Sequence, residues 1–334
     1  MADAVRWKKK QPGITAALAQ VLDQTTGGDP QRARKWSRRS LRWLSWQLRE
    51  QGYQACPRTV GRLLRDLGYG FRSNQKQVEG VKPESAQRRD AQFGNITALR
   101  AEFTTAGLPI LSLDTKKKEH VGTFKNAGQE WCQAPQRVNL HDFPQAASAL
   151  AVPYGIYDVT RNRGTVYVGT SADTAEFAVA AVRRWWEEEG RRAYPGARRV
   201  LLLVDSGGSN GYRSRLWKQQ LQEKLCNGLG LEVVVCHYPP GCSKWNPVEH
   251  RLFSQISINW AAQPLRDLTT MLQLIRGTTT STGLRVRARL LLRKFATGIK
   301  ISNRVMRQIN LVRAAICPDW CYTIKPLQQL TAPA

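Results

Sequence analysis

Apolar residues recur at helical spacing in the first part of the chain. Between residues 40 and 50, leucines follow one another at intervals of three and four, which predicts a short amphipathic helix. A second helix is expected after the turn at 51–57, because Pro57 suits a first helical position and Gly68 is a stop signal. The arginines of this second helix are left for its outer surface, and they are Arg58, Arg62 and Arg65.

The two short helices and the glycine-containing turn between them form a helix-turn-helix pattern. In such a pattern the second helix is the natural candidate to enter the major groove of DNA. The alternative is a small helical domain whose arginines only keep it soluble. We expect this region to span residues 1–71.

Short β-rich runs alternate with helical ones from about residue 108 to residue 260. One helix is expected to open with Asp173 and Glu176 as a capping box, and another to cover residues 212–226. Strands that alternate with helices predict a mixed α/β sheet with helices against its faces. The expected strands are 109–114, 154–159, 165–169, 199–205 and 231–238.

Two segments flank this α/β region without a predicted core of their own. Residues 72–90 are polar and poor in apolar side chains, so the segment 72–107 is expected to be a linker or helical arm. Residues 263–334 contain basic runs such as RVRARLLLRKF and are expected to form a basic C-terminal extension. The α/β domain is accordingly expected at 108–262.

Basic charge is concentrated at the two ends of the chain. Lysine and arginine exceed aspartate and glutamate by 51 to 25 overall, for a net charge of +26. Residues 1–100 carry 20 basic against 8 acidic side chains, residues 101–250 carry 18 against 15, and residues 251–334 carry 13 against 2, which gives +12, +3 and +11. A surface this basic gains by releasing counterions from a polyanion, so double-stranded DNA is the expected partner. The alternative is a generally basic, solvated surface.

Two predicted strands end in an aspartate, and one predicted helix begins near a glutamate. Asp114 follows ILSL and Asp205 follows LLLV, and a carboxylate at the end of a buried strand sits where a magnesium ion can reach it. Glu249 stands third in a helix for which Asn246 is the expected N-cap. Taken singly, each aspartate could cap a turn, and Asn246 with Glu249 could form a capping box. Together, on a basic protein with a helix-turn-helix pattern, the three acids favour a metal site.

The seven cysteines do not suggest a disulfide framework, because their number is odd and no secretion signal precedes them. Zinc has to be considered at two places, Cys317 with Cys321, and the group of Cys236, His237, Cys242 and His250. Neither set has the paired C-x-x-C spacing, so structural zinc is not the favoured expectation.

Membrane insertion is not expected from the hydropathy of the chain. No run approaches the 18 or more apolar residues that a membrane span needs. The start, MADAVRWKKKQPG, has basic residues without an apolar segment after them. We therefore expect a cytoplasmic protein, associated with the nucleoid if it is bacterial.

Several longer blocks make the sequence recognisable. The most distinctive are SLDTKKKEHVGTFKNAGQEW at 112–131, DSGGSNGYRSRLWK at 205–218 and CHYPPGCSKWNPVEHRLFS at 236–254. With these blocks the chain resembles the DDE transposases of bacterial insertion sequences, most closely the ISAzo-type family, also called the Rhodopirellula-type DDE transposases. The resemblance covers roughly residues 28–326 and includes VNLHDFP, PYGIYDV, DTAEFAVAAVRRWW and TTTSTGLRVRA.

The resemblance implies an RNase H-like mixed-sheet catalytic domain, preceded by a helical helix-turn-helix DNA-binding domain. It also implies a catalytic triad, carried here by Asp114 in SLDTKKK, Asp205 in VDSGGSNG and Glu249 in NPVEHRLF. Pro247 and Val248 stand where the family pattern has lysine and isoleucine, and this departure leaves the carboxylates in place.

The expected activity is metal-dependent cleavage of DNA and strand transfer of an insertion sequence. The triad would hold two Mg²⁺ ions, for which Mn²⁺ can substitute, with Asp114 between them. A homodimer or higher oligomer on the transposon ends and target DNA is implied by the resemblance. Four lysines are candidates to hold phosphates near the metals, or are simply solvated charges, and they are Lys116, Lys117, Lys118 and Lys244.

Two other functions stay open on the sequence. A non-catalytic DNA-binding protein or repressor, derived from a transposase, would share the basic flanks but would not need the three carboxylates. An RNase H-like nuclease acting on hybrids or junctions would need the carboxylates but not an N-terminal domain that reads DNA. The terminal repeats and the target site depend on DNA and are not encoded in this chain.

Overall fold

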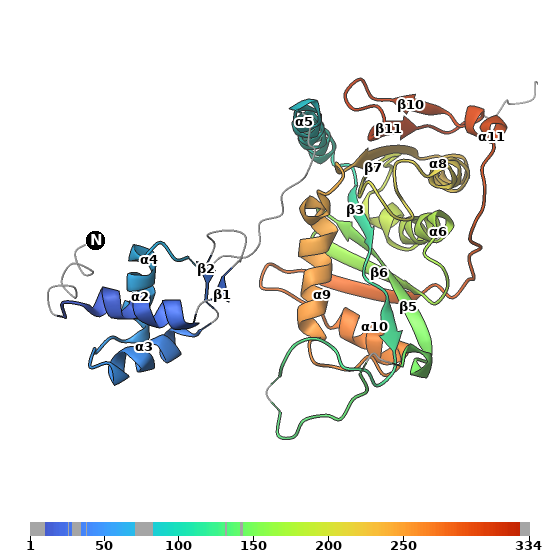
Figure 1. Cartoon of the computed structure of the whole chain (residues 1–334). Coiled ribbons are helices and arrows are strands. Elements are labelled where there is room, and N and C mark those ends of the chain that lie inside the picture. Colours follow the sequence, from blue (N-terminus) through green and yellow to red (C-terminus); the bar gives the residue numbers. More distant parts are fainter. Residues whose placement is uncertain are drawn as a thin grey trace, which may run out of the picture. The chain divides into compact units, whose positions relative to one another are not determined.

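The structure is a computed structural model of the 334-residue chain and describes residues 11–25, 27–28, 35–37, 39–70, 83–130, 132–140 and 143–327. The chain forms two compact units, residues 1–79 and residues 80–334. Both are drawn in Figure 1. Among the described residues, no helix combines the length and the apolar character that crossing a bilayer requires.

In the described residues of the N-terminal unit, the helices are α2 (Ile14–Thr25), α3 (Leu41–Glu50) and α4 (Pro57–Asp66), and a two-residue β1 (Gly27–Gly28) pairs with β2 (Lys35–Trp36). The two helices expected from the leucine spacing are therefore present. Ser40 caps α3 by accepting the amide of Trp43 at 3.1 Å, and Pro57 occupies the first turn of α4. Leu44, Leu48 and Leu63 are buried where the helices meet.

The C-terminal unit is built on a nine-stranded sheet in the order β10-β11-β8-β7-β3-β5-β6-β9, with β4 paired to β5. Neighbours are parallel at β3/β7, β7/β8 and β6/β9, and antiparallel at the other pairs. The strands are β3 (Ile110–Thr115), β4 (Glu119–Val121), β5 (Ala149–Asp158), β6 (Arg163–Gly169), β7 (Arg199–Val204), β8 (Glu232–His237), β9 (Arg285–Leu290), β10 (Leu311–Arg313) and β11 (Cys321–Ile324). The expected mixed α/β sheet is confirmed, and β6-β5-β3-β7-β8 has the order and directions of an RNase H-like sheet.

Helices cover both faces of this sheet (Figure 1). On one face, α6 (Ala175–Trp185) and α8 (Arg215–Gln220) bury their apolar side chains against alternate residues of the central strands. On the other face lie α5 (Pro83–Thr105), α9 (Ser254–Asn259) and α10 (Leu268–Arg276). Because side chains alternate between the two faces of a strand, neighbouring residues of β3 and β7 serve different cores.

Two of the expected boundaries differ from the structure. Residues 83–105 form α5, whose Ile96 and Phe103 pack on β3 and β7, so this part of the expected linker belongs to the sheet unit. The expected C-terminal extension belongs to the same unit. It contributes the strands β9, β10 and β11 to the sheet and the helix α10 to one of its faces. The strong basic charge of this segment obscured its alternating pattern, because arginines fill the outward positions of β9 while Val286 and Ala288 are buried. Residues 71–82 lie outside the described residues.

Helix starts inside the unit also differ in detail. The N-cap of α6 is Thr174, whose hydroxyl accepts the amide of Phe177 at 3.2 Å, so the expected capping box of Asp173 and Glu176 is wrong by one position. The helix expected at 212–226 begins with α8 at Arg215 and continues as a π-helix, η3 (Leu221–Asn227). The shift at α6 frees the side chain of Asp173 for a contact near the candidate site.

Candidate active site

Asp114 and Asp205 lie next to each other at the end of two parallel strands. The ladder between β3 and β7 pairs Leu113 with Val204, and the next residue on each strand is one of the two aspartates. Both side chains are only half-buried. Asp114 Oδ1 accepts the amide of Thr115 at 2.8 Å. The backbone therefore fixes the spacing of these two carboxylates on a rigid support.

Glu249 reaches the same edge from a π-helix, η5 (Val248–Phe253), which follows a short 3-10 turn, η4 (Ser243–Trp245). The Asn246 side chain does not cap this helix, so the capping-box alternative for Asn246 and Glu249 is excluded. Asn246 instead donates to the Leu113 carbonyl at 3.1 Å and to Asp205 Oδ1 at 3.2 Å.

Ser112 of β3 completes this attachment of η5 to the sheet. Its hydroxyl donates to Asn246 Oδ1 at 2.5 Å and accepts the amide of Val248 at 2.8 Å. Ser112 and Asn246 are fully buried, so every one of these bonds is made away from solvent. Together they hold the first residues of η5, and with them Glu249, against the strand that carries Asp114.

A glycine on the neighbouring strand gives η5 the room to approach. Gly155 of β5 pairs directly with Asp114 in the ladder. A Cβ atom built on Gly155 would collide with the ring of Phe253 and lie 3.1 Å from Val248 Cγ2. Only a glycine therefore allows this close packing of η5 on the sheet beside Asp114.

The three carboxylates affect one another electrostatically. Burial raises the pKa of Asp114 to about 8, with further upward contributions from the negative charges of Asp205 and Glu249. Burial also raises the pKa of Asp205 to about 6, and Glu249 adds to the rise while the hydrogen bond from Asn246 opposes it. Like charges at short range disfavour the ionised forms, so this edge of the sheet favours the arrival of positive charge.

The candidate lysines fall into two groups. Lys116 is mostly buried, forms an ion pair with Glu119 at 2.7 Å and lies 4.5 Å from the ring centroid of Trp260. Lys117 and Lys118 are exposed, and so is Lys244 in the turn before η5. Among the described residues, no ion pair is formed by these three exposed lysines.

Sequence reasoning missed several residues that shape this site. Asp173 accepts a hydrogen bond from the Thr115 hydroxyl at 3.2 Å, which brings a fourth acid to the strand end that carries Asp114. His237 is buried beneath the site, with Nδ1 2.8 Å from the Asp205 carbonyl oxygen, and burial lowers its pKa to about 4. Of these contacts, only the proximity of His237 to a strand end could have been read from the sequence.

The cysteines form no disulfide bond, and the described residues contain no ready-made group of metal ligands. All seven cysteines are free, and Cys236 faces Cys321 across the β8/β11 ladder. Within the described ranges, no three or more His, Cys, Asp or Glu side chains are arranged so that they could hold an ion. Asp114, Asp205 and Glu249 are therefore not gathered into a closed set of protein ligands, and any ion held by them would need water or substrate oxygens as further ligands.

Comparison with known proteins places the sequence in a family. A family model described as "Rhodopirellula transposase DDE domain" matches residues 17–326. No curated protein matches the chain. Solved structures with some similarity include "Mos1 transposase paired-end complex with left transposon end", at 14% identity over 78% of this chain and 68% of that chain with a TM-score of 0.41. Another is "Crystal structure of the Mos1 mariner paired end complex with Mn", at 15% identity over 78% and 69% with a TM-score of 0.40. The chain belongs to the Rhodopirellula transposase DDE domain family, as its sequence resemblance predicts.

Proposed function

We propose that this protein is a transposase that cleaves DNA and transfers the cut strand, with Asp114, Asp205 and Glu249 as the catalytic carboxylates. The observation that carries the proposal is the placement of these acids: Asp114 and Asp205 lie at the ends of two paired parallel strands, and buried hydrogen bonds of Ser112 and Asn246 attach the start of η5, which carries Glu249, to the strand of Asp114. Three carboxylates from three separate elements, two of them with raised pKa values, form a site suited to divalent cations.

The donor set fits Mg²⁺, with Mn²⁺ as a substitute. Mg²⁺ prefers oxygen ligands and is usually held by one or two carboxylates together with water and substrate phosphates, not by a closed cage of protein groups. Asp114, whose pKa is affected by both of the other acids, would be one of the residues that hold the ions. Divalent ions held here would supply Lewis-acid stabilisation of phosphoryl oxygens and an ionised water nucleophile.

The protein's own groups position the reacting parts. Asn246 fixes the orientation of the Asp205 carboxylate through its 3.2 Å hydrogen bond. Lys117, Lys118 and Lys244 are exposed, lie within five residues of Asp114 or Glu249 in the sequence, and would bind the DNA backbone phosphates, while Lys116 would first have to leave Glu119. Holding the scissile phosphate in line with a nucleophile supplies much of the rate in phosphoryl transfer.

The N-terminal unit is proposed to read DNA as a helix-turn-helix domain. On α4, Arg58 and Arg65 are exposed, Arg62 is half-buried, and Leu63 anchors the opposite side in the core. This is the arrangement that a recognition helix in a major groove requires. Its ligands would be the transposon ends, held by a dimer or higher oligomer in the cytoplasm on the nucleoid.

The test is cleavage of labelled duplex DNA carrying the element's ends, with Mg²⁺ or Mn²⁺, by the wild-type protein and by Asp205→Asn. Products with a free 3′-hydroxyl from the wild type alone would support the transposase. Binding by both proteins without cleavage by either would favour a non-catalytic repressor. Cleavage of RNA–DNA hybrids in preference to element ends would favour an RNase H-like nuclease.

A further inference from the structure

A second charged site lies at the opposite end of the sheet from the carboxylates. A cavity of about 330 Å³ opens where β5 ends and where β6 and β9 begin. In the ladder between β3 and β5, Asp158 pairs with Leu111. Leu111 precedes Asp114 by three residues, so the two ends of the sheet are roughly 10 Å apart along β3. Since Asp158 and Leu111 belong to the face covered by α6, the cavity and the three carboxylates also lie on different faces. We call this cavity the arginine pocket, and its charged lining residues are Asp158, Arg161, Arg163, Glu189, Arg192, Arg285 and Arg287.

Positive charge exceeds negative charge in this lining by five arginines to two acids. Both acids are already engaged. Asp158 accepts the Tyr194 hydroxyl, whose oxygen lies 2.8 and 2.9 Å from its two carboxylate oxygens, and the backbone amide of Arg161 at 3.1 Å. Glu189 accepts from Thr165 at 3.1 Å and pairs with Arg287 at 3.4 Å. An excess of three positive charges remains for an occupant of the pocket.

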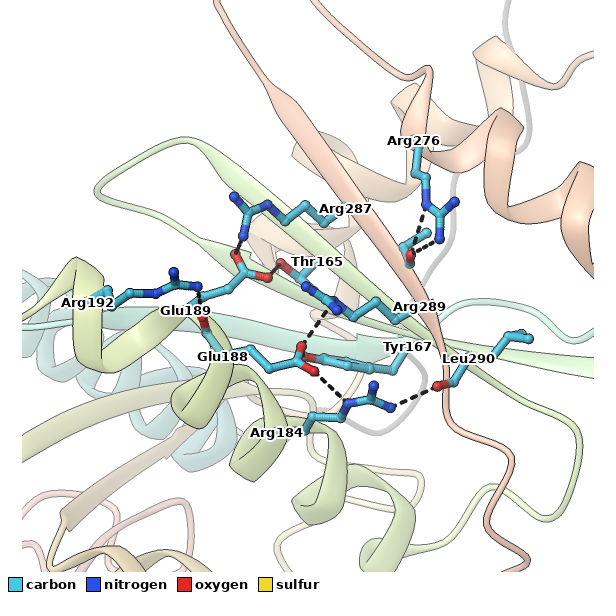
Figure 2. Close-up of polar contacts among 11 residues, drawn as sticks. Thr165, Tyr167, Arg184, Glu188, Glu189, Arg192, Arg276, Arg287, Arg289 and Leu290 are labelled. Carbon is cyan, nitrogen blue, oxygen red and sulfur yellow. Dashed lines mark hydrogen bonds and ion pairs between the residues drawn. The ribbon is translucent and has the colours of Figure 1, made fainter.

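Figure 2 shows how the neighbouring acids are used. Glu188 receives Arg289 at 3.0 Å and Arg184 at 2.8 Å, and it also accepts from the Tyr167 hydroxyl at 3.0 Å. The Arg192 side chain donates to a backbone carbonyl, that of Glu188. The acids beside the pocket are therefore saturated by other partners.

Among the described residues, the remaining arginines of the pocket are not held in ion pairs by carboxylates, although Arg161 is near enough to Asp158 to oppose the rise that burial causes in the pKa of that acid. Within the described part of the chain, Arg161, Arg163, Arg192 and Arg285 form no ion pair with a carboxylate. The Nη1 atom of Arg163 is buried and has no hydrogen-bond partner among the described residues. A buried, charged donor without an acceptor is costly, and an anion in the pocket would satisfy it.

Edge protection does not explain this arrangement. Arginines on the edge strand β9 would discourage pairing with another sheet, which accounts for exposed Arg285 and Arg287. It does not account for Arg163, which lies on the inner neighbour β6, or for Arg161 and Arg192, which come from a turn and a helix. Three separate elements therefore converge arginines on one cavity.

We propose that the arginine pocket binds backbone phosphates of DNA, as a second contact separate from the catalytic carboxylates. Guanidinium groups match phosphate oxygens with paired hydrogen bonds and stay charged at every physiological pH. Arg285 and Arg287 stand two residues apart on a strand that continues the basic row to Arg289, so one DNA strand can follow this edge. DNA is named as the partner on the strength of the proposed function, whereas the phosphate chemistry rests on the pocket alone.

The test compares two double variants of the full chain that remove equal charge. Arg163→Gln with Arg285→Gln alters the pocket, and Arg304→Gln with Arg307→Gln alters exposed arginines of α11 (Asn303–Arg307). Binding to a fluorescent duplex is measured in EDTA over a series of NaCl concentrations. The pocket variant is expected to bind about tenfold more weakly and to lose about one to two from the slope of log affinity against log salt. The control is expected to change by about twofold or less.

Equal effects in the two variants would overturn the proposal. So would thermal stabilisation by inorganic phosphate that the pocket variant loses while its DNA affinity is unchanged, because the pocket would then serve a small anion. If Arg163→Gln prevents folding, as circular dichroism would reveal, Arg285→Gln alone alters an exposed side chain and carries the test. The experiment measures DNA binding and not cleavage. The proposal for the pocket can therefore hold even if the protein cuts no DNA.

Discussion

At the end of the sheet where β3 and β7 finish, three carboxylates face one another, whereas arginines outnumber acids at the end where β6 and β9 begin. The pKa values differ in the same sense. Burial and neighbouring acids raise the pKa of Asp114 to about 8, but hydrogen bonds from Arg184 and Tyr167 outweigh burial and hold the pKa of Glu188 below its ordinary value.

The difference between the two ends gives a criterion for charged side chains. A charge that neighbouring groups compensate has a structural role, whereas an uncompensated charge is a candidate to bind a ligand. Glu188 is a structural acid, because its neighbours compensate it inside the folded chain. Asp114 has a raised pKa beside two other acids, and among the described residues the buried Nη1 atom of Arg163 has no hydrogen-bond partner. We therefore expect each of them to mark a place for a partner of opposite sign. A divalent cation suits the first place and a phosphate suits the second.

The largest effect is expected from a change at the acidic end, the end of the sheet that carries Asp114, Asp205 and Glu249. Glu249→Gln removes a proposed metal ligand while it keeps the size of the side chain, and we expect DNA cleavage to fall roughly 1000-fold or more. Glu223→Gln, on the exposed surface of η3, is the matched control and should leave the cleavage rate unchanged. Comparable activity of the two variants in a cleavage assay would remove Glu249 from the proposed site.

A second change tests how the acidic end is held in place. Asn246→Ala deletes the side chain that joins Leu113 and Asp205, and it leaves the Ser112 hydroxyl without its acceptor. We expect a loss of about 2–3 kcal/mol in the free energy of unfolding. Cleavage at a temperature where the variant is fully folded should fall by about 100-fold, because Asp205 and Glu249 lose their common support. A folded variant with normal cleavage would show that Asn246 has no positioning role.

A pair of glycine substitutions sharpens the same point. Gly155→Ala and Gly164→Ala both push side chains of η5, those of Phe253 and Leu252 respectively. We expect both variants to lose stability, by about 1–3 kcal/mol. Only Gly155 lies beside Asp114, so Gly155→Ala should also reduce cleavage, by roughly tenfold, in assays on folded protein. Equal loss of cleavage in the two variants would mean that the effect is general destabilisation.

The smallest expected effect is a pH dependence that belongs to the acidic end alone. Asp114 has a pKa of about 8 in the folded protein against an ordinary 3.8, so the folded chain holds more protons than the unfolded chain between these values. The free energy of unfolding therefore falls as the pH rises through this range. Asp205, with a pKa of about 6, adds to this fall in stability only at the lower pH values of the range. His237, with a pKa lowered to about 4, makes stability rise with pH, but only up to its ordinary pKa of 6.5.

Thermal unfolding in EDTA from about pH 7 to about pH 8.5 isolates Asp114. The wild type should lose roughly 1 kcal/mol of stability across this window, and Asp114→Asn should be nearly flat. The Arg285→Gln variant should keep the wild-type slope, because the arginines at the other end do not titrate. A wild-type slope that persists in Asp114→Asn would assign the proton to another group.

Much of the fold was predictable because its central strands carry plain signals. The five expected strands correspond to β3, β5, β6, β7 and β8, whose continuous apolar runs come from burial on both faces. The strands β9, β10 and β11 were not predicted, because they are short or carry arginine at outward positions. Their place depends on pairing with distant strands, which local periodicity does not encode.

The sequence was enough to propose the three acids, but it did not indicate the residues that support them. Asp114 and Asp205 were found because a strand end is visible in sequence, and Glu249 because a helix start is visible. Asn246 looked like a cap, yet its side chain bonds across 133 residues to the Leu113 carbonyl. Gly155 and Arg163 likewise acquire their roles only from tertiary contacts, with Phe253 in one case and with the arginine pocket in the other.

The central claim is that Asp114, Asp205 and Glu249 together bind divalent cations. Its most direct test is calorimetric titration of Mn²⁺ into the wild type, Asp114→Asn and Asp205→Asn, with Glu223→Gln as control, at a pH of about 7.5 in the presence of uncleavable duplex DNA. The account predicts saturable binding by the wild type and the control, and a loss of affinity of roughly tenfold or more in each aspartate variant. Equal Mn²⁺ binding by all four proteins would contradict it.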